Sequence, residues 1–366
     1  MKIAIIGTRG IPNNHGGFEQ CAEYLSKYLV SKDHEVFVYN SHIHPYQEKV
    51  WNGVNIVHCI DPEDRIGTPG QFIYDLYCIM DTRKRNFDVI LQLGYTSSSI
   101  WGWLLPKKPV IVTNMDGLEW KRSKYSKPVK GFLKIAERLA IKTSDFLVSD
   151  SIGIKEYLKE KYNKNSEYIA YGAELFEKPD IKILKKYDVE KYEYDILIAR
   201  LEPENNIEVI LDGIVHQKNK SPFLVIGKHE TKFGEYLKDK FKSNKNVRFL
   251  GGIYNLNYLN NLRYYSNRYF HGHSVGGTNP SLLEAMASNC FIIANDNKFN
   301  KGVLGDDALY FKNSEDIVNC LERQKEKYSS FIGNNLKKIK QELNWDHINN
   351  KYEEYLQKCL TSKLGK

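Results

Sequence analysis

Gly272–Ala287, GHSVGGTNPSLLEAMA, is the stretch from which the fold and the site are most directly inferred. A glycine-rich turn runs into a helix, with Asn279 as the expected N-cap and Pro280 as the first helical residue. The unpaired amides at such a helix start bind anions, because the helix dipole is positive there. Glu284, about one turn further on, is placed to accept hydrogen bonds from hydroxyl groups. We expect a diphosphate cradle at Gly276, Gly277 and Asn279, with an ordinary capped helix as the alternative.

Short apolar runs alternate with stretches of helical spacing along the whole chain, which is the pattern of a doubly wound parallel sheet. The first series of expected strands covers residues 2–7, 35–39, 55–59, 88–92, 110–113 and 146–148, with a further possible strand at 168–170. The second series covers residues 195–199, 223–227, 247–251, 268–271, 291–294 and 308–311. We therefore predict an α/β protein with two Rossmann-like domains that face each other across a cleft.

The chain of 366 residues is long enough for these two domains. We expect the first domain at residues 1–179 and the second at residues 180–344, after a charged, Lys- and Tyr-rich connection. Residues 345–360 have helical spacing, and the last segment, 345–366, is a candidate to return to the first domain.

Composition and cysteine spacing restrict the class of protein. The net charge of +8 is moderate, and the basic residues are not interleaved with aromatic residues as in a nucleic-acid-binding module. The six cysteines form no CxxC pair, which is typical of reduced cysteines in the cytoplasm. The apolar start at residues 1–6 is too short for a signal peptide, and no apolar run approaches about 18 residues. We expect a cytoplasmic protein without a membrane span.

Two residue sets follow expected strands, where ligands gather in such sheets. Arg200 follows the strand 195–199, and a guanidinium can hold a phosphate through two parallel hydrogen bonds. The alternative is a surface ion pair with Glu202 or Glu204. Gly16 and Gly17 end the loop after the first strand, where free amides can meet a diphosphate or an acceptor hydroxyl. This loop, TRGIPNNHGGFE, lacks GxGxxG, which disfavours a dehydrogenase; a flexible surface turn is the alternative.

Three more residues follow strands of the first series. Asp116 comes after the strand 110–113, Asp150 after the strand 146–148, and Tyr171 after the possible strand 168–170. Side chains in these positions line one edge of a parallel sheet, where they can hold the hydroxyls of an acceptor or a donor. Each one alone has an ordinary alternative as a helix cap, a turn residue or a packed tyrosine.

Basic residues concentrate between residues 107 and 142. After Pro128, Lys130, Lys134, Arg138 and Lys142 recur every four residues, with Phe132, Ile135, Ala136 and Leu139 expected on the packed side. The stretch 100–108, IWGWLLPKK, adds an aromatic and basic edge. These features predict contact with anionic lipid headgroups or with a pyrophosphate-linked acceptor, and a solvated face on a packed helix is the alternative.

His271 and His273 flank Gly272, but no carboxylate or cysteine completes a recognisable ligand set near them. We therefore expect no metal site and no bound cofactor other than a substrate.

The motifs ARLEPENN at 199–206 and PSLLEAMA at 280–287, with the opening strand and its GG loop, resemble glycosyltransferase family 4 over nearly the whole chain. This family is retaining and has the two-domain GT-B fold. The stretches GTRGIPNNHGGFE at 7–19, NMDGLEWKRSKY at 114–125 and HGHSVGGTNPSLLEA at 271–285 further resemble its rhamnosyltransferase branch in bacterial surface-polysaccharide synthesis. The resemblance implies an acceptor-binding first domain and a second domain that binds a nucleotide sugar.

The resemblance also assigns roles to residues. It implies that Arg200 binds the donor diphosphate, Glu284 the ribose, and the amides of Gly277, Thr278, Asn279 and Ser281 the phosphates. The chain departs from the family at two places: Asn205 stands where a lysine is usual, and Gly276 stands where the first Glu of an E-x7-E motif is usual. The histidine of the family's catalytic loop is also replaced, with Asp116 in its neighbourhood. Loss of a glutamate that touches the sugar is compatible with rhamnose, which has one hydroxyl fewer than a hexose.

We therefore expect metal-independent, retaining transfer of L-rhamnose from dTDP-rhamnose to a lipid-linked saccharide at the inner face of the cell membrane. Two alternatives stay open. A nucleotide-sugar epimerase uses the same fold, and a non-catalytic nucleotide-sugar-binding scaffold would fit the departures at Asn205 and Gly276.

Overall fold

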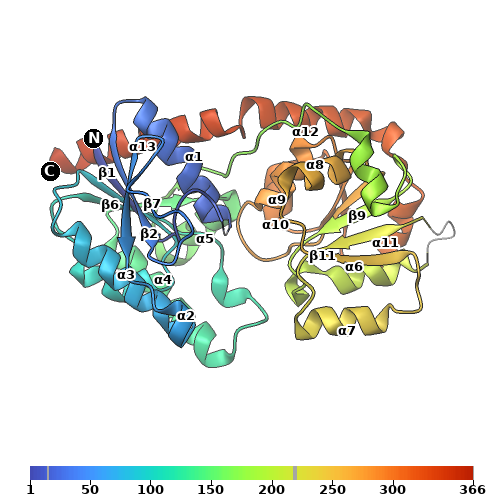
Figure 1. Ribbon diagram of the computed structural model, residues 1–366, viewed down its shortest axis with the longest axis horizontal. Helices are drawn as coiled ribbons and strands as arrows, with labels where there is room; N and C mark the ends of the chain where they lie inside the picture. The colour runs from blue at the N-terminus through green and yellow to red at the C-terminus, as the bar shows by residue number, and fades with distance from the viewer. Residues whose placement is uncertain (15, 217–220, 366) are drawn as a thin grey trace. The chain divides into compact units, whose positions relative to one another are not determined.

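The computed structural model describes residues 1–14, 16–216 and 221–365 of the chain. It consists of two compact units, each built on its own sheet (Figure 1). Unit 1 contains Met1–Trp120, Ser126–Tyr171 and Trp345–Lys366, and unit 2 contains Lys121–Tyr125 and Gly172–Asn344. The two ends of the chain therefore belong to the same unit.

The sheet of unit 1 has eight strands in the order β3-β4-β2-β1-β5-β6-β7-β8. Neighbouring strands are parallel except for the pair of β3 and β4. The strand order reverses between β1 and β5, and such a switch point is where ligands bind in doubly wound sheets. The strands are β1 (Lys2–Ile6), β2 (Glu35–Ser41), β3 (Val50–Trp51), β4 (Val54–Cys59), β5 (Val89–Leu93), β6 (Val110–Asn114), β7 (Phe146–Ser149) and β8 (Glu167–Tyr168).

Helices cover the sheet of unit 1, with α1 and α13 above it and α3 below it in the view of Figure 1. Apolar residues of α1 recur every three or four positions, and Cys21, Ala22, Leu25 and Leu29 are buried as the sequence pattern predicts. The helices are α1 (Gly17–Ser31), α2 (Glu63–Ile66), α3 (Pro69–Thr82), α4 (Lys127–Thr143), α5 (Ile152–Tyr162) and α13 (Trp345–Leu364), with the 3-10 segments η1 (Ser98–Leu104) and η2 (Glu119–Lys121).

The last helix, α13, packs against α1 although more than 300 residues separate them in sequence. The ring of Trp345 stacks on Tyr24 with the ring centroids 4.5 Å apart. Further along α13, the Tyr352 hydroxyl accepts a hydrogen bond from Asn114 Nδ2 at 2.9 Å, at the end of β6. The amphipathic pattern of the last segment therefore serves unit 1, the domain to which we expect it to return.

The sheet of unit 2 has six strands in the order β11-β10-β9-β12-β13-β14, and all its pairs are parallel. Its switch point lies between β9 and β12. The strands are β9 (Asp195–Ile198), β10 (Phe223–Ile226), β11 (Val247–Gly251), β12 (Arg268–His271), β13 (Ile292–Asn295) and β14 (Leu309–Phe311). The helical segments are η3 (Ile181–Tyr187), η4 (Pro203–Asn205), α6 (Ile207–Ile214), α7 (Lys232–Lys240), α8 (Leu256–Tyr264), α9 (Pro280–Ala287), α10 (Lys298–Leu304), α11 (Ser314–Leu321), η5 (Lys325–Tyr328) and α12 (Ser329–Gln341).

A buried ion pair joins the first residues of the two central strands of unit 2. Arg268 donates from Nε and Nη2 to the two carboxylate oxygens of Asp195, at 2.8 and 2.6 Å. Both residues are almost completely buried. Apolar side chains of the neighbouring strands, Leu197, Val225, Phe270 and Ile293, lie together in the core above them. The ion pair therefore holds the starts of β9 and β12 together.

The boundary between the units lies earlier than the expected one between residues 179 and 180. Backbone hydrogen bonds from Ala173 N to Leu343 O (2.8 Å) and from Phe176 N to Ala287 O (3.1 Å) tie this segment to unit 2. The segment Lys121–Tyr125 also belongs to unit 2, although it stands between two parts of unit 1 in sequence.

Two expected elements of unit 1 differ from the structure. The strand β8 ends at Tyr168 rather than at residue 170, because its partner β7 ends at Ser149 and only Ile169 N still bonds to that residue's carbonyl, at 3.0 Å. In α4, Ile135 is 54% exposed and is not part of the packed side. The buried residues of α4 are Leu133, Ala136, Glu137, Ala140 and Ile141.

Glu137 explains the different rotation of α4. Its carboxylate is buried and accepts hydrogen bonds from Tyr157 Oη (2.7 Å) and Trp120 Nε1 (3.2 Å), and it pairs with Lys161 Nζ at 3.1 Å. A charged residue with this many partners can take a core position that a hydrophobic pattern does not predict.

No helix in the described part of the chain combines the length and the apolar character needed to cross a bilayer.

Candidate functional site

The loops after β9 and β12 meet at the switch point of unit 2. A Cβ atom on Gly272 would lie 1.9 Å from the carbonyl oxygen of Asn205, so this close approach requires glycine. Ser274 donates to the carbonyl of Glu204 from its backbone N (3.1 Å) and from its hydroxyl (2.7 Å). Asn206 Nδ2 donates to the carbonyl of Gly272 at 2.8 Å. The structure therefore brings Arg200 and the glycine-rich stretch, predicted separately from the sequence, into one site.

Arg200 is exposed at this site. Among these three described residues, Arg200 forms no ion pair with Glu202 or Glu204, which was the alternative. Glu204 is buried, and its carboxylate accepts a hydrogen bond from Ser123. Asn205 is 5% exposed, and its Nδ2 donates to the carbonyl of Arg200 at 2.6 Å. The side chain of Asn205 thus holds the turn that presents Arg200, instead of offering its amide to a ligand.

The helix α9 starts as the sequence predicts. Asn279 Oδ1 accepts a hydrogen bond from Ser281 N at 2.9 Å, and Pro280 is the first helical residue. Gly276 has a φ of +127°, a conformation that L side chains rarely adopt, and no other part of the described chain comes within 4 Å of the position its Cβ would take. Gly277 and the buried Thr278 complete the turn. The capped helix and an open space beside the turn together provide amides and room for an anion.

Glu284 and Ser281 belong to a hydrogen-bonded network around a buried arginine, Arg263. Arg263 Nη2 lies 2.6 Å from Glu284 Oε2 and donates to Ser281 Oγ at 3.0 Å. The hydroxyl of Ser281 also contacts that of Tyr269, at 2.9 Å. Arg263 is 1% exposed, whereas the side chain of Glu284 is 21% exposed. Glu284 is therefore held in one orientation with part of its carboxylate still open to a ligand.

The sequence gives no indication of a role for Arg263. Its helix, α8, has a mixed polar composition and carries no motif, and only the tertiary structure shows that the guanidinium lies under α9. A buried cation beside a candidate carboxylate has no signal in residue spacing, because the two residues are on different helices.

Two stacked histidines lie beside this turn. The rings of His271 and His273 are 4.5 Å apart and nearly parallel. Both ring nitrogens of His271 and Nδ1 of His273 are buried without a hydrogen-bond partner in the described structure. Burial, followed by the charges of Arg200 and Arg122, lowers the pKa of His273 to about 3, and burial and the neighbouring His273 hold the pKa of His271 well below its usual value. Both imidazoles are therefore neutral at physiological pH.

In unit 1, the residues predicted to meet the acceptor lie at the carboxyl edge of the sheet. Gly16 is the N-cap of α1 and Gly17 its first residue, so the start of this helix lies at the switch point after β1. Asp116, with a φ of +47°, stands in the turn after β6 and is partly exposed. Gly16 is exposed, and Gly17 and Asp116 are partly exposed, so a ligand can reach these three residues.

Tyr171 and Asp150 are both buried at this edge of the sheet. Tyr171 is 6% exposed and packs against Phe18, with the ring centroids 6.4 Å apart. Burial, with the charges of Asp116 and Asp150, raises the pKa of Tyr171 well above its ordinary value. These effects also show that the three residues gather at one place. Asp150 is 2% exposed, and the cap of the following helix is Ser151, which accepts from Ile154 N. A packed tyrosine, one of the alternatives for Tyr171, fits the structure.

The loop after β1 is ordered by specific contacts. Arg9 pairs with Asp61 at 3.3 Å and with Glu63 at 2.5 Å, and Asn40 Oδ1 accepts from Ile11 N at 3.0 Å. Arg9 and Ile11 therefore have defined partners within unit 1. His15, in the same loop, lies outside the described residues.

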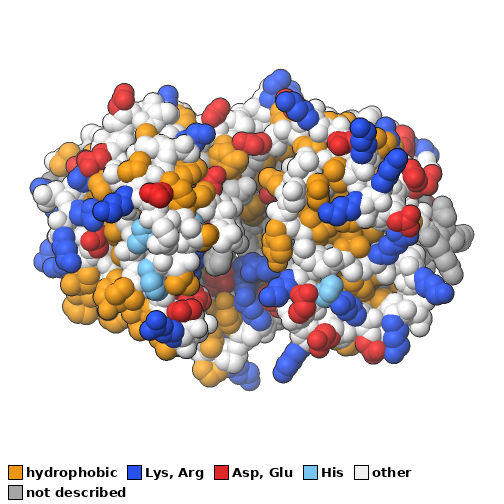
Figure 2. Space-filling view, viewed as in Figure 1, with side chains coloured by type: hydrophobic (Ala, Val, Ile, Leu, Met, Phe, Trp, Pro, Cys, Tyr) orange, Lys and Arg blue, Asp and Glu red, His pale blue; other side chains and the backbone are white. Residues whose placement is uncertain are grey.

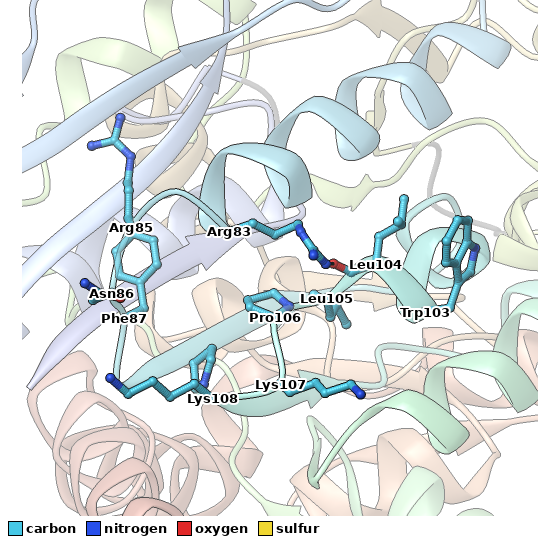
Figure 3. A pocket seen from close by; sticks show the side chains of 11 residues that line it. Arg83, Arg85, Asn86, Phe87, Trp103, Leu104, Leu105, Pro106, Lys107 and Lys108 are labelled. Atoms are coloured by element: carbon cyan, nitrogen blue, oxygen red, sulfur yellow. Dashed lines mark hydrogen bonds between the residues drawn. The ribbon is translucent and has the colours of Figure 1, made fainter.

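A basic pocket of about 610 Å³ lies before β5 and β6, at the edge of the sheet of unit 1 opposite to Gly16 and Asp116. Its lining includes Arg83, Arg85, Lys107 and Lys108 and no carboxylate. Figure 3 shows Arg83 reaching toward the carbonyl of Leu104, to which its Nη1 donates at 2.7 Å, and Trp103 beside it. Trp103 is 74% exposed. Arg85 is paired with Asp81 at 2.6 Å, and the pocket combines the remaining basic residues with apolar surface.

Comparison with known proteins covers both units. Residues 180–337 match the family described as glycosyl transferases group 1, and residues 1–174 match a domain of unknown function, DUF1972. No curated protein matches the chain.

Solved structures share the fold over nearly the whole chain. Sucrose-phosphate synthase from Thermosynechococcus elongatus has a TM-score of 0.81 at 14% identity, covering 99% of both chains. HepE from Anabaena, in complex with UDP-glucose, has a TM-score of 0.76 at 13% identity, covering 97% of this chain and 99% of that chain. The α,α-trehalose 6-phosphate synthase from Burkholderia multivorans has a TM-score of 0.70 at 10% identity, covering 99% of both.

Proposed function

We propose that this chain is a glycosyltransferase that transfers L-rhamnose from dTDP-rhamnose to a lipid-linked saccharide. Its residues 180–337 match the glycosyl transferases group 1 family, and its fold is similar to that of sucrose-phosphate synthase. The reaction retains the anomeric configuration and serves surface-polysaccharide synthesis. The observation that carries the proposal is the contact between two loops at the switch point of unit 2: the loop that begins with the exposed Arg200 and the loop that leads into the glycine turn before α9.

Arg200 and the amides before α9 stabilise the leaving diphosphate. Negative charge grows on the diphosphate as its bond to the sugar breaks, and fixed donors aimed at that charge lower the barrier. The guanidinium offers paired hydrogen bonds, and the amides around Thr278 and Asn279 are oriented by the cap of α9. By the resemblance to family 4, the leaving phosphate itself helps to deprotonate the acceptor hydroxyl, so no protein nucleophile and no metal are required.

Two features support the proposed donor. The carboxylate of Glu284, oriented by Arg263, suits the hydroxyls of a ribose. Gly276 has no side chain, whereas family 4 usually places a glutamate against the sugar at this position. The space left beside Gly276 fits a 6-deoxy sugar. HepE is similar in fold and binds UDP-glucose, so a uridine donor has to be compared with the thymidine donor directly.

Acceptor binding is proposed for unit 1. The amides of Gly16 and Gly17 suit the pyrophosphate of a lipid-linked acceptor, and the partly exposed Asp116 suits its hydroxyl. The membrane contact is proposed for the other edge of unit 1. The basic pocket with Trp103 and the exposed Ile135 beside Lys134 and Arg138 combine charge with apolar surface, as a peripheral contact with anionic lipid at the cytoplasmic face needs.

Replacing Arg200 by alanine tests the catalytic part of the proposal. We expect the transfer rate to fall at least about tenfold, or 1.4 kcal/mol in the barrier, because one donor to the leaving diphosphate is lost. The measurement is mass spectrometry of product formed from dTDP-rhamnose and short lipid-pyrophosphate saccharides. Lys242, exposed and paired with Asp239 at 2.8 Å, provides a matched charge-removal control. Unchanged turnover of Arg200→Ala would remove this residue from the mechanism.

The same assay separates the alternatives. Reaction with UDP-glucose but not with dTDP-rhamnose contradicts the rhamnose assignment. Isomerised nucleotide sugar formed with water alone identifies an epimerase. Tight binding of the donor without transfer to any lipid-linked acceptor supports the scaffold.

A further inference from the structure

We propose that Arg122 is the second cation of the diphosphate site in unit 2, where it binds the nucleoside diphosphate together with Arg200. The inference rests on the proposed function and assigns a residue for which the sequence indicates no role.

Arg122 lies in a short segment of unit 2. The segment Lys121–Tyr125 belongs to unit 2, although the strand before it, β6, belongs to unit 1. Ser123 Oγ donates to a carboxylate oxygen of Glu204. The backbone carbonyl of Glu204 in turn accepts from both the amide and the hydroxyl of Ser274. A single residue thus connects the segment that carries Arg122 to both loops of the switch point.

Arg122 and Arg200 are related by the effect of their charges on one residue, His273. The positive charges of Arg200 and Arg122 both act on the imidazole of His273, so both residues lie in the neighbourhood of this ring. The backbone of His273 is fixed, because its carbonyl accepts from Asn297 Nδ2 (3.0 Å) and Asn300 Nδ2 (3.1 Å). Its Nδ1 has no hydrogen-bond partner in the described structure. Both guanidinium groups carry a positive charge, so an anion bound near His273 is attracted by both of them.

Asn205 stands where family 4 usually has a lysine. Asn205 carries no charge, and its amide holds the carbonyl of Arg200. A diphosphate carries more than one negative charge, so a single guanidinium leaves part of it without a partner. Arg122 supplies the second charge from outside the two loops. The ligand class that fits is a nucleoside diphosphate, because its two phosphates can reach two separated guanidinium groups while its ribose reaches Glu284.

The experiment measures binding of dTDP and of thymidine to the full chain by isothermal titration calorimetry. Arg122→Gln should weaken dTDP binding about tenfold or more and leave thymidine binding unchanged, since thymidine has no phosphate. Arg122→Lys should retain most of the affinity. Removal of one phosphate contact should also lower the dependence of dTDP binding on salt. Lys124→Gln is the matched control, because Lys124 is exposed in the same segment with its Nζ 5.2 Å from the Tyr125 ring centroid.

The outcomes separate this inference from the proposed function. If Arg122→Gln binds dTDP like the wild type, with an unchanged thermal unfolding midpoint, the inference is wrong. If the wild type binds UDP and not dTDP, only the assignment of a thymidine donor is wrong. Calorimetry of the same variants with UDP and uridine then tests the role of Arg122. Diphosphate binding that depends on Arg122 without any sugar transfer upholds the inference and contradicts the transferase. A wild type that binds neither diphosphate overturns both.

Discussion

His271 and His273 show how single side chains connect the site to its electrostatics. Their rings stack on each other, and Tyr269 continues the stack with its ring centroid 6.3 Å from that of His271. The groups that face them carry positive charge: Arg263 acts on His271, and Arg200 and Arg122 act on His273. Protonation of either imidazole would add a cation beside existing cations. Both rings therefore stay neutral, and a neutral imidazole can accept or donate a hydrogen bond to a bound ligand.

We predict that this pair makes unit 2 less stable in acid. In the unfolded chain a histidine binds a proton near pH 6.5, whereas the folded pKa of His273 is about 3 and that of His271 is also far below 6.5. The unfolded state therefore binds more protons as the pH falls below about 6.5, and stability is lost toward pH 3 by at most about 1.4 kcal/mol per pH unit for each proton. We expect the free energy of unfolding in urea to fall less between pH 7.5 and pH 5.5 for His271→Phe than for the wild type. An equal fall for both proteins would contradict the prediction.

At the scale of elements, η1 and α4 form the surface of unit 1 that we assign to the membrane. The 3-10 segment η1 packs along α4, and a Cβ on Gly102 would lie 2.6 Å from the hydroxyl of Thr143, so glycine allows this contact. The packing leaves Trp103 and Ile135 at the surface. Figure 2 shows further hydrophobic side chains at the surface where Figure 1 places α2 and α3, which carry the exposed Ile66, Tyr77 and Met80.

Charge reversal at the basic pocket tests this surface. We expect the double variant Lys107→Glu, Lys108→Glu to bind phosphatidylglycerol vesicles at least about tenfold more weakly than the wild type, because each basic residue near an anionic membrane contributes about 1 kcal/mol. Co-sedimentation with vesicles of phosphatidylglycerol and of phosphatidylcholine provides the measurement. Lys242→Glu, in unit 2, is the control. Equal binding of the wild type to both lipids, or full binding by the double variant, would argue against a membrane role for the pocket.

At the scale of the whole molecule, the chain leaves unit 1 at Tyr171 and re-enters it at Trp345. Unit 1 is therefore complete only when the last helix has formed. The side chains that α13 buries include Trp345, Ile348, Tyr352, Leu356 and Cys359. Their contacts with α1 and β6 link the two ends of the sequence.

We expect Trp345→Ala to destabilise unit 1 by about 3–5 kcal/mol, because a 5% exposed ring that stacks on Tyr24 is lost. Hydrogen exchange of the full chain should show faster exchange in α1 and α13 than in the wild type, while β9 and β12 of unit 2 keep their protection. Trp103→Ala, which removes a 74% exposed ring from the same unit, is the control. Unchanged protection of α1 would mean that the return of α13 is not needed for the stability of unit 1.

The sequence by itself determined most of the elements and the turn before α9, because these depend on local rules. The spacing of apolar residues gave both series of strands, and Asn279 with Pro280 gave the start of α9. Arg200 could be predicted as well, since a residue after a buried parallel strand must lie at the carboxyl edge of the sheet.

Only the tertiary structure decided which side chains are already occupied. Asn205 bonds within its own turn, Ser281 and Glu284 are held by Arg263, and Tyr171 is packed, none of which residue spacing can show. The tertiary structure also placed Arg122 in unit 2 and Ile135 at the surface. The physical reason is that these outcomes depend on contacts between segments far apart in sequence, where burial and charge are set by the partner and not by the local pattern.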